Sequence, residues 1–118
     1  MQFALFIYHG TMPTPNTEAW NALSEDEQKS IYAGYGAVNK NPAVTPGIGL
    51  GPAADAKTVR VEDGKTVATE GPFAGLEGAV GGYLVFEAED EAEAVELAAS
   101  IPAAQFGGAV EVRPVVSY

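Results

Sequence analysis

The sequence contains no cysteine and only one histidine. Disulfides, thiolate catalysis and cysteine-ligated zinc sites are therefore excluded, and nothing in the chain requires an oxidising compartment. No apolar run approaches the roughly 20 residues that are needed to cross a membrane. The opening segment MQFALFIYHG has no basic start and no small-residue cleavage site, so it predicts an early strand rather than a signal peptide. We expect a cytoplasmic protein with no membrane partner.

Basic residues are also scarce. Six Lys and Arg residues stand against sixteen Asp and Glu residues, which gives a net charge of −10. A nucleic-acid partner is not expected, because phosphate binding requires a stripe of Lys and Arg, and anionic membranes are disfavoured for the same reason. The 118 residues suit a single domain that covers residues 1–118.

Two stretches have the sequence pattern of helices. Ser24 and Glu27 fit a capping box that opens SEDEQKSIYAGYGAVNK, and Asp90 and Glu93 fit a second one before DEAEAVELAASI. Apolar residues recur at helical spacing in both stretches, at Ile31, Tyr35 and Val38 and at Val95, Ala98 and Ile101. Pro102 is expected to end the second helix.

The remaining apolar segments predict strands. QFALFIY, GGYLVFEA and AVEVRPVV are rich in branched and aromatic residues, and NPAVTPGIGLGP predicts a short edge strand between prolines. Asp63 and Gly64 predict a type I′ hairpin turn with Glu62 opposite Lys65. Without this hairpin, the order is β-α-β-β-α-β. We therefore expect an α+β, ferredoxin-like fold with an added β-hairpin and both helices on one face of the sheet.

Alternation along the strands predicts which side chains lie on the helix-free face. Leu84, Phe86, Val110 and Val112 suit the face beneath the helices. The helix-free face then carries Tyr83, Val85, Glu87, Glu111 and Arg113. Such a face is costly in water unless it is covered. We expect a two-fold homodimer in which two sheets pack face to face and enclose a small cavity.

Several of these residues are candidates for a functional site. His9 ends the first strand at the rim of the sheet, where it is either a general base or a solvent-facing residue. Glu87 and Glu111 have two possible uses, a magnesium or calcium site or an ion pair with Arg113, and the ion pair is favoured. Arg113 could instead hold an anionic ligand by a bidentate contact. We expect no metal and no cofactor, because no complete dinucleotide-binding or phosphate-binding motif is present.

One segment links the chain to a family. TEGPFAGLEGAVGGY resembles the DGPFAETKEQLGGY signature of the YCII-related (DGPF-motif) family. FALFIYHG, AWNALSEDEQ, GIGLGPAADAKTVRVEDGKTVATEGPF and PAAQFGGAVEVRPV are similar to further family segments in the same order. The resemblance implies a ferredoxin-like dimer of the dimeric α/β-barrel group.

The departures from the family pattern bear on catalysis. The signature Asp is Glu70 here, and the motif loop comprises Glu70, Gly71, Pro72 and Phe73. The resemblance implies a catalytic dyad of a His on the first helix and an Asp before the proline that ends the second helix. This first helix has no His, and Ile101 precedes Pro102. That dyad is therefore not available to this chain.

The motif loop itself has two interpretations. It either turns the chain and packs Phe73 into the core or the dimer seam, or forms a glycine-rich flap that gates a ligand over the open sheet face. Gly81 and Gly82 would let the backbone bulge or approach a neighbour closely before the strand.

Two functions follow, together with a purely structural role beside another protein. The missing dyad favours a non-catalytic small-molecule-binding or accessory protein, a dimer with its pocket between the two sheets. The candidate ligand-binding residues are Tyr83, Glu87, Glu111 and Arg113. The alternative is a cofactor-independent enzyme acting on a small aromatic or lactone-like compound, as several dimeric α/β-barrel proteins are. In it, His9 or a carboxylate would be the base and Arg113 would orient an anion.

Overall fold

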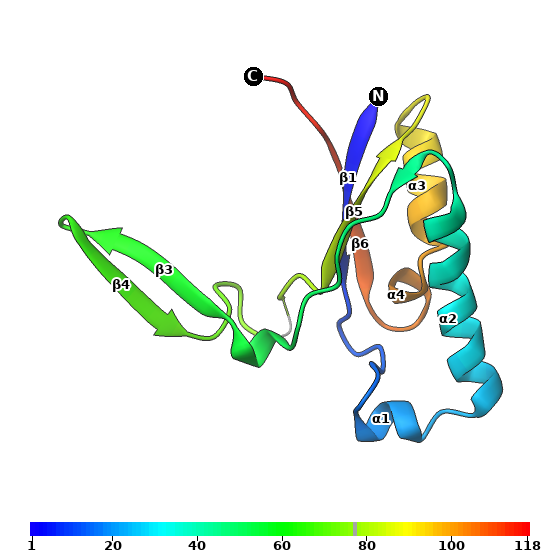
Figure 1. The fold of residues 1–118 in the computed structure, drawn as a ribbon, viewed down its shortest axis with the longest axis horizontal. Helices are drawn as coiled ribbons and strands as arrows, with labels where there is room; N and C mark the ends of the chain where they lie inside the picture. The colour runs from blue at the N-terminus through cyan, green and yellow to red at the C-terminus, as the bar shows by residue number, and fades with distance from the viewer. Residues whose placement is uncertain (77) are drawn as a thin grey trace.

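The computed structural model describes residues 1–76 and 78–118 and consists of an antiparallel sheet with helices on one face (Figure 1). The elements are β1 (Gln2–Tyr8), α1 (Glu18–Asn21), α2 (Glu25–Lys40), β2 (Val44–Thr45), the 3-10 turn η1 (Ala53–Asp55), β3 (Lys57–Glu62), β4 (Lys65–Glu70), β5 (Gly82–Glu87), α3 (Glu91–Ala99), α4 (Pro102–Gln105) and β6 (Ala109–Pro114). The main sheet has the strand order β2-β5-β1-β6. The predicted α+β, ferredoxin-like architecture with an added hairpin is confirmed.

Strand β1 lies at the centre of this sheet. It pairs antiparallel with β5 on one side and with β6 on the other, so that Leu5 is opposite both Leu84 and Val112. Strand β2 pairs with β5 at the sheet edge, as the proline-bounded segment predicted. The inward-facing side chains form the core together with the helices; its buried members include Phe3, Leu5, Ile7, Val38, Leu84, Phe86 and Ile101.

Helix α2 begins at the predicted capping box. The Ser24 hydroxyl accepts a hydrogen bond from the Glu27 amide at 3.1 Å, and Glu27 Oε1 accepts one from the Ser24 amide at 3.0 Å. Ile31 and Val38 are buried, and Tyr35 packs against the core. The burial of these residues confirms the predicted apolar face of this helix. Their helical spacing turns them to the same side of the helix.

Helix α3 differs from the prediction in two respects. Asp90 Oδ1 accepts a hydrogen bond from the Glu93 amide at 2.9 Å, but Glu93 does not complete a capping box. The buried residues of α3 are Ala94 and Ala98, whereas Val95 is 51% exposed. The expectation for Val95 was wrong because the face that meets the sheet follows the small alanines rather than the larger valine.

The two short helices were not predicted. Helix α1 lies within the segment that the prolines indicated to be a loop, and its first amides are satisfied by Thr17, whose hydroxyl accepts from the Trp20 amide at 3.2 Å. Helix α3 ends at Ala99, and Pro102 opens α4 rather than ending α3. A proline is well suited to the first position of a helix, where its missing amide costs nothing.

The β3–β4 hairpin forms a separate two-stranded sheet. Asp63 and Gly64 have φ angles of 50° and 75°, which is the expected type I′ geometry, and Glu62 is opposite Lys65 as predicted. The hairpin extends away from the main sheet, on the side opposite α2 and α3 (Figure 1). The radius of gyration is 16.1 Å, above the roughly 13.5 Å expected for a compact chain of this length. No helix in the described ranges is long and apolar enough to cross a membrane.

Candidate functional site

The helix-free face of the main sheet carries the predicted set of residues. Tyr83, Glu87, Glu111 and Arg113 are exposed and Val85 is half-buried, while their neighbours along β5 and β6 point towards the core. Phe6 of β1 lies between Tyr83 and Glu111 in the register. The Phe6 and Tyr83 rings are in contact, with centroids 6.5 Å apart and planes tilted by 43°. The strand alternation therefore identified this face correctly.

The charges on this face do not pair as predicted. Within the described residues, Arg113 forms no ion pair with Glu87 or Glu111, and Glu87 Oε1 instead lies 3.2 Å from the amino group of Met1. The register separates Arg113 from Glu87, since Arg113 is opposite Ala4 while Glu87 is opposite Gln2 on the far side of β1. Glu111 lies on the same face of β6 as Arg113, and nothing in the structure explains why those two do not pair. Arg113 is exposed and has no ion-pair partner among the described residues. Over the part of the chain described, no three His, Cys, Asp or Glu residues could together hold a metal ion.

A second concave site lies around His9, directly after β1. It is a cavity of about 590 Å³, a volume within the roughly 300–1,000 Å³ of small-molecule sites. The His9 ring is half-buried, and burial lowers the pKa of its imidazole below the ordinary 6.5. Burial therefore favours the uncharged form of this side chain. His9 follows the last residue of β1, at the end of that strand, as the sequence predicted.

Aromatic side chains from two helices line the same cavity. They are Trp20 from α1 and Tyr32 and Tyr35 from α2. Trp20 is buried, and its ring meets Tyr32 edge-on with centroids 5.2 Å apart. The Tyr35 hydroxyl is enclosed and has no hydrogen-bond partner among the residues that the structure describes. Burial raises the pKa of Tyr35, and the nearby Ala103 backbone partly opposes this increase without completing a hydrogen bond.

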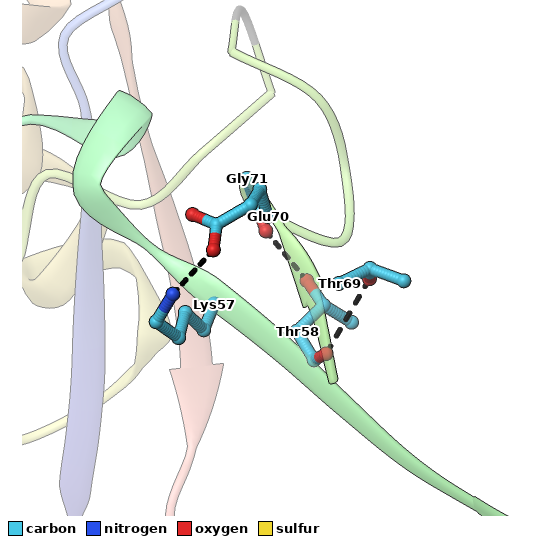
Figure 2. A network of polar contacts seen from close by, with 5 residues as sticks. All are labelled: Lys57, Thr58, Thr69, Glu70 and Gly71. Carbon is cyan, nitrogen blue, oxygen red and sulfur yellow. Dashed lines mark hydrogen bonds and ion pairs between the residues drawn. The ribbon is translucent and has the colours of Figure 1, made fainter. Parts of the chain in front are cut away.

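The motif loop lies elsewhere, at the base of the hairpin. Figure 2 shows that Glu70 forms an ion pair with Lys57 and that the Thr58 hydroxyl donates to the Gly71 carbonyl at 2.8 Å. The Thr69 hydroxyl donates to the Thr58 carbonyl at 3.4 Å, and the Gly71 amide donates to the Ala56 carbonyl at 2.8 Å. Glu70 and Gly71 thus close the hairpin where it joins the body of the protein.

Phe73 does not pack into the core. Its side chain is 74% exposed, and the Arg60 guanidinium lies 5.0 Å from its ring centre. Pro72 and Phe73 line a second, more open cavity of about 510 Å³, to which Tyr8 also contributes. Tyr8 lies on the helix-free face of β1, so this loop borders the open face, as the gating interpretation requires.

The sequence reasoning did not identify Trp20 and Tyr32 as site residues and assigned Tyr35 to the core alone. Tyr32 and Tyr35 are three residues apart on one helix, a spacing that favours a common face. The distance in sequence between Trp20 and this pair gave no indication of a shared cavity. The contact is made by the fold, which brings α1 against the first half of α2.

These features define a class of protein: a ferredoxin-like domain with an open sheet face and an aromatic-lined cavity, and without an assembled nucleophile–base–acid set in the described residues. The model of the YCII-related domain matches residues 1–118. The chain therefore belongs to the YCII-related domain family. Comparison with curated proteins found no match.

Proposed function

We propose that this protein is a homodimeric small-molecule-binding protein whose ligand lies between two facing sheets. The observation that carries the proposal is the composition of the helix-free face, where Phe6 and Tyr83 lie in contact beside Glu111 and Arg113. A face that mixes exposed aromatic and aliphatic groups is stabilised by cover. A two-fold axis would place the same face of a second subunit over it.

The hairpin supports the same assembly. It extends on the side of the helix-free face (Figure 1), and Val59 and Val61 on β3 are 62% and 69% exposed. A two-stranded hairpin without cover is only marginally stable in water. A second subunit docked on the sheet would lie beside this arm and would bury its valines.

Two matched variants test the dimer. Val85→Glu places a charge on the helix-free face, and Val95→Glu places the same charge on the outer surface of α3. We expect light scattering at micromolar concentration to give a dimer for the wild type and for Val95→Glu, and a monomer for Val85→Glu. A monomeric wild type would contradict the proposal.

Arg113 is the proposed anchor for an anionic ligand, because its guanidinium has no ion-pair partner among the described residues. A ligand that binds the folded state raises the melting temperature. A panel of small anionic metabolites is expected to yield at least one such shift, which Arg113→Ala abolishes. Lys40→Ala removes a positive charge from the end of α2 and should keep the shift. A shift that survives in Arg113→Ala would show that Arg113 is not the anchor.

The half-buried His9 favours a second candidate function, a cofactor-independent enzyme acting on a small aromatic or lactone-like compound. An uncharged imidazole at the wall of a cavity is suited to accept a proton from a bound substrate. Turnover that disappears in a folded His9→Ala variant would support this function. Turnover that is unchanged in the variant would exclude His9 as the base.

A further inference from the structure

The His9 cavity is formed within one subunit and is distinct from the helix-free face. Its walls come from the segment after β1, from α1, from the middle of α2, and from the loops that precede β3 and β5. None of Tyr83, Glu87, Glu111 and Arg113 lines it. It therefore does not depend on the dimer or on the proposed anion anchor.

The wall of this cavity suits a planar aromatic ring. The edge-on contact between Trp20 and Tyr32 leaves the two rings at 74° to each other, so that they form a corner. Aliphatic side chains, including Ile31, Leu50 and Val80, complete the lining. Aromatic ligands gain from such corners through edge-to-face and offset contacts as well as through burial.

His9 provides one polar group of this lining, beside Thr14, Asn16 and Thr17. Its ring lies so close to Gly81 that a Cβ atom at position 81 would be 2.5 Å from His9 Nδ1. The backbone of Gly81 thus fixes one side of the imidazole. A neutral imidazole has one donor and one acceptor nitrogen, so it can bond a hydroxyl or a carbonyl of a ligand.

The charges that line the cavity indicate whether a neutral or a charged ligand is favoured. The protein carries a net charge of −10, yet no Asp, Glu, Lys or Arg of the described residues lines this cavity. A charged ligand would lose its hydration here without gaining a counter-charge from the described lining, which is unfavourable. The lining thus favours a neutral ligand over an anion or a cation of the same size.

We propose that the His9 cavity binds a neutral aromatic molecule with one hydrogen-bonding group, of the phenol class. Its ring lies in the corner of Trp20 and Tyr32, and its polar group bonds the His9 imidazole. This site is separate from the ligand proposed between the sheets, and a subunit that fails to dimerise would keep it. It lies in the cavity that the second candidate function uses, but it requires binding alone and no turnover.

Trp20 is the only tryptophan of the chain, so its fluorescence reports directly on this cavity. The experiment titrates the full chain with phenol, benzoate and benzyltrimethylammonium, with excitation at the red edge of tryptophan absorption. We expect phenol to change the emission in a saturable way and the two charged probes to bind at least about ten-fold more weakly. Equal binding of all three probes, or no change with phenol up to its solubility limit, would overturn the proposal.

Two variants and a map of the contacts complete the test. Tyr32→Ala, at the exposed rim, is expected to weaken phenol binding about five-fold, while the similarly exposed Val95→Ala on α3 should leave it unchanged. Amide shifts of a labelled sample should concentrate at His9, Tyr32 and Gly81. Shifts confined to β5 and β6 would place phenol on the helix-free face and overturn the site. The oligomeric state of the same samples, measured separately, shows whether the dimer proposal fails independently.

Discussion

Gly34 on α2 lies directly against Pro102, the first residue of α4. A Cβ atom at position 34 would be 2.7 Å from Pro102 Cγ, whereas one at Gly36 would meet nothing within 4 Å. The first glycine therefore permits a close helix contact, and the second has no such role. This contact places α4 beside the middle of α2, one residue from Tyr35.

The two glycines give a matched pair of variants. Gly36→Ala is expected to stabilise the protein by up to about 1 kcal/mol, because alanine is the better helix former. Gly34→Ala gains the same propensity but forces a methyl group against a rigid ring, so we expect a net loss of about 1–2 kcal/mol. Urea denaturation of both variants checks this, and equal effects would show that Gly34 does not contact Pro102 closely.

Removal of the enclosed Tyr35 hydroxyl is not expected to destabilise the protein. A buried hydroxyl without a partner carries a desolvation cost, so Tyr35→Phe is expected to leave stability unchanged or raise it by about 1 kcal/mol. For a chain of this size that is a rise of roughly 3–6 °C in melting temperature. A clear loss of stability on thermal unfolding would mean that the hydroxyl has a partner in the folded protein.

The lowered pKa of His9 predicts an acid-side loss of stability. Burial penalises the charged imidazole in the folded state, so the unfolded chain takes up a proton first as the pH falls below 6.5. The free energy of unfolding should therefore decrease on acidification from that pH down to the folded-state pKa of His9. His9→Gln, which does not titrate, should show a flatter profile by denaturant unfolding across this window. Parallel profiles for the two proteins would contradict the burial effect.

Glu27 predicts a second pH range, below that of His9, in which the stability of the protein changes. The Ser24 amide and hydroxyl hold the pKa of Glu27 below its ordinary 4.5, so the stabilisation from this cap is present above that value. It should be lost as the pH falls through the folded-state pKa. The difference in unfolding free energy between wild type and Glu27→Gln should accordingly shrink in acid. A difference that stays constant below pH 4.5 would show that the carboxylate form of Glu27 adds nothing.

At the base of the hairpin, we expect the ion pair between Glu70 and Lys57 to contribute less to stability than the backbone conformation of Gly71. Glu70→Gln breaks an exposed ion pair with Lys57 and should cost less than about 1 kcal/mol. Gly71 has a φ of 94°, which is unfavourable for residues with a Cβ atom, so Gly71→Ala should cost about 1–2 kcal/mol. Hydrogen exchange of the β3 and β4 amides measures the stability of the hairpin in each variant. A larger loss of stability in Glu70→Gln than in Gly71→Ala would contradict this prediction.

Local signals in the sequence predicted much of the fold. The capping box of Ser24 and Glu27, the turn at Asp63 and Gly64 and the alternation along β6 each involve residues at most three positions apart. Interactions of that range depend on backbone geometry alone, so a short segment determines them. Combined with the order of elements, they were sufficient for the ferredoxin-like topology and for the composition of its helix-free face.

The charge pairing of Arg113, the exposure of Phe73 and the cavity beside His9 were decided by the tertiary structure. The cavity joins segments around residues 9–20, 31–35, 50–53 and 79–81, together with Leu76, and these segments meet only after the chain has folded. Arg113 does not reach Glu87 because the register of three strands sets which side chains are neighbours. The sequence by itself determined the local geometry and the faces of the elements. Contacts between distant segments depend on how those faces pack in three dimensions, which only the tertiary structure decided.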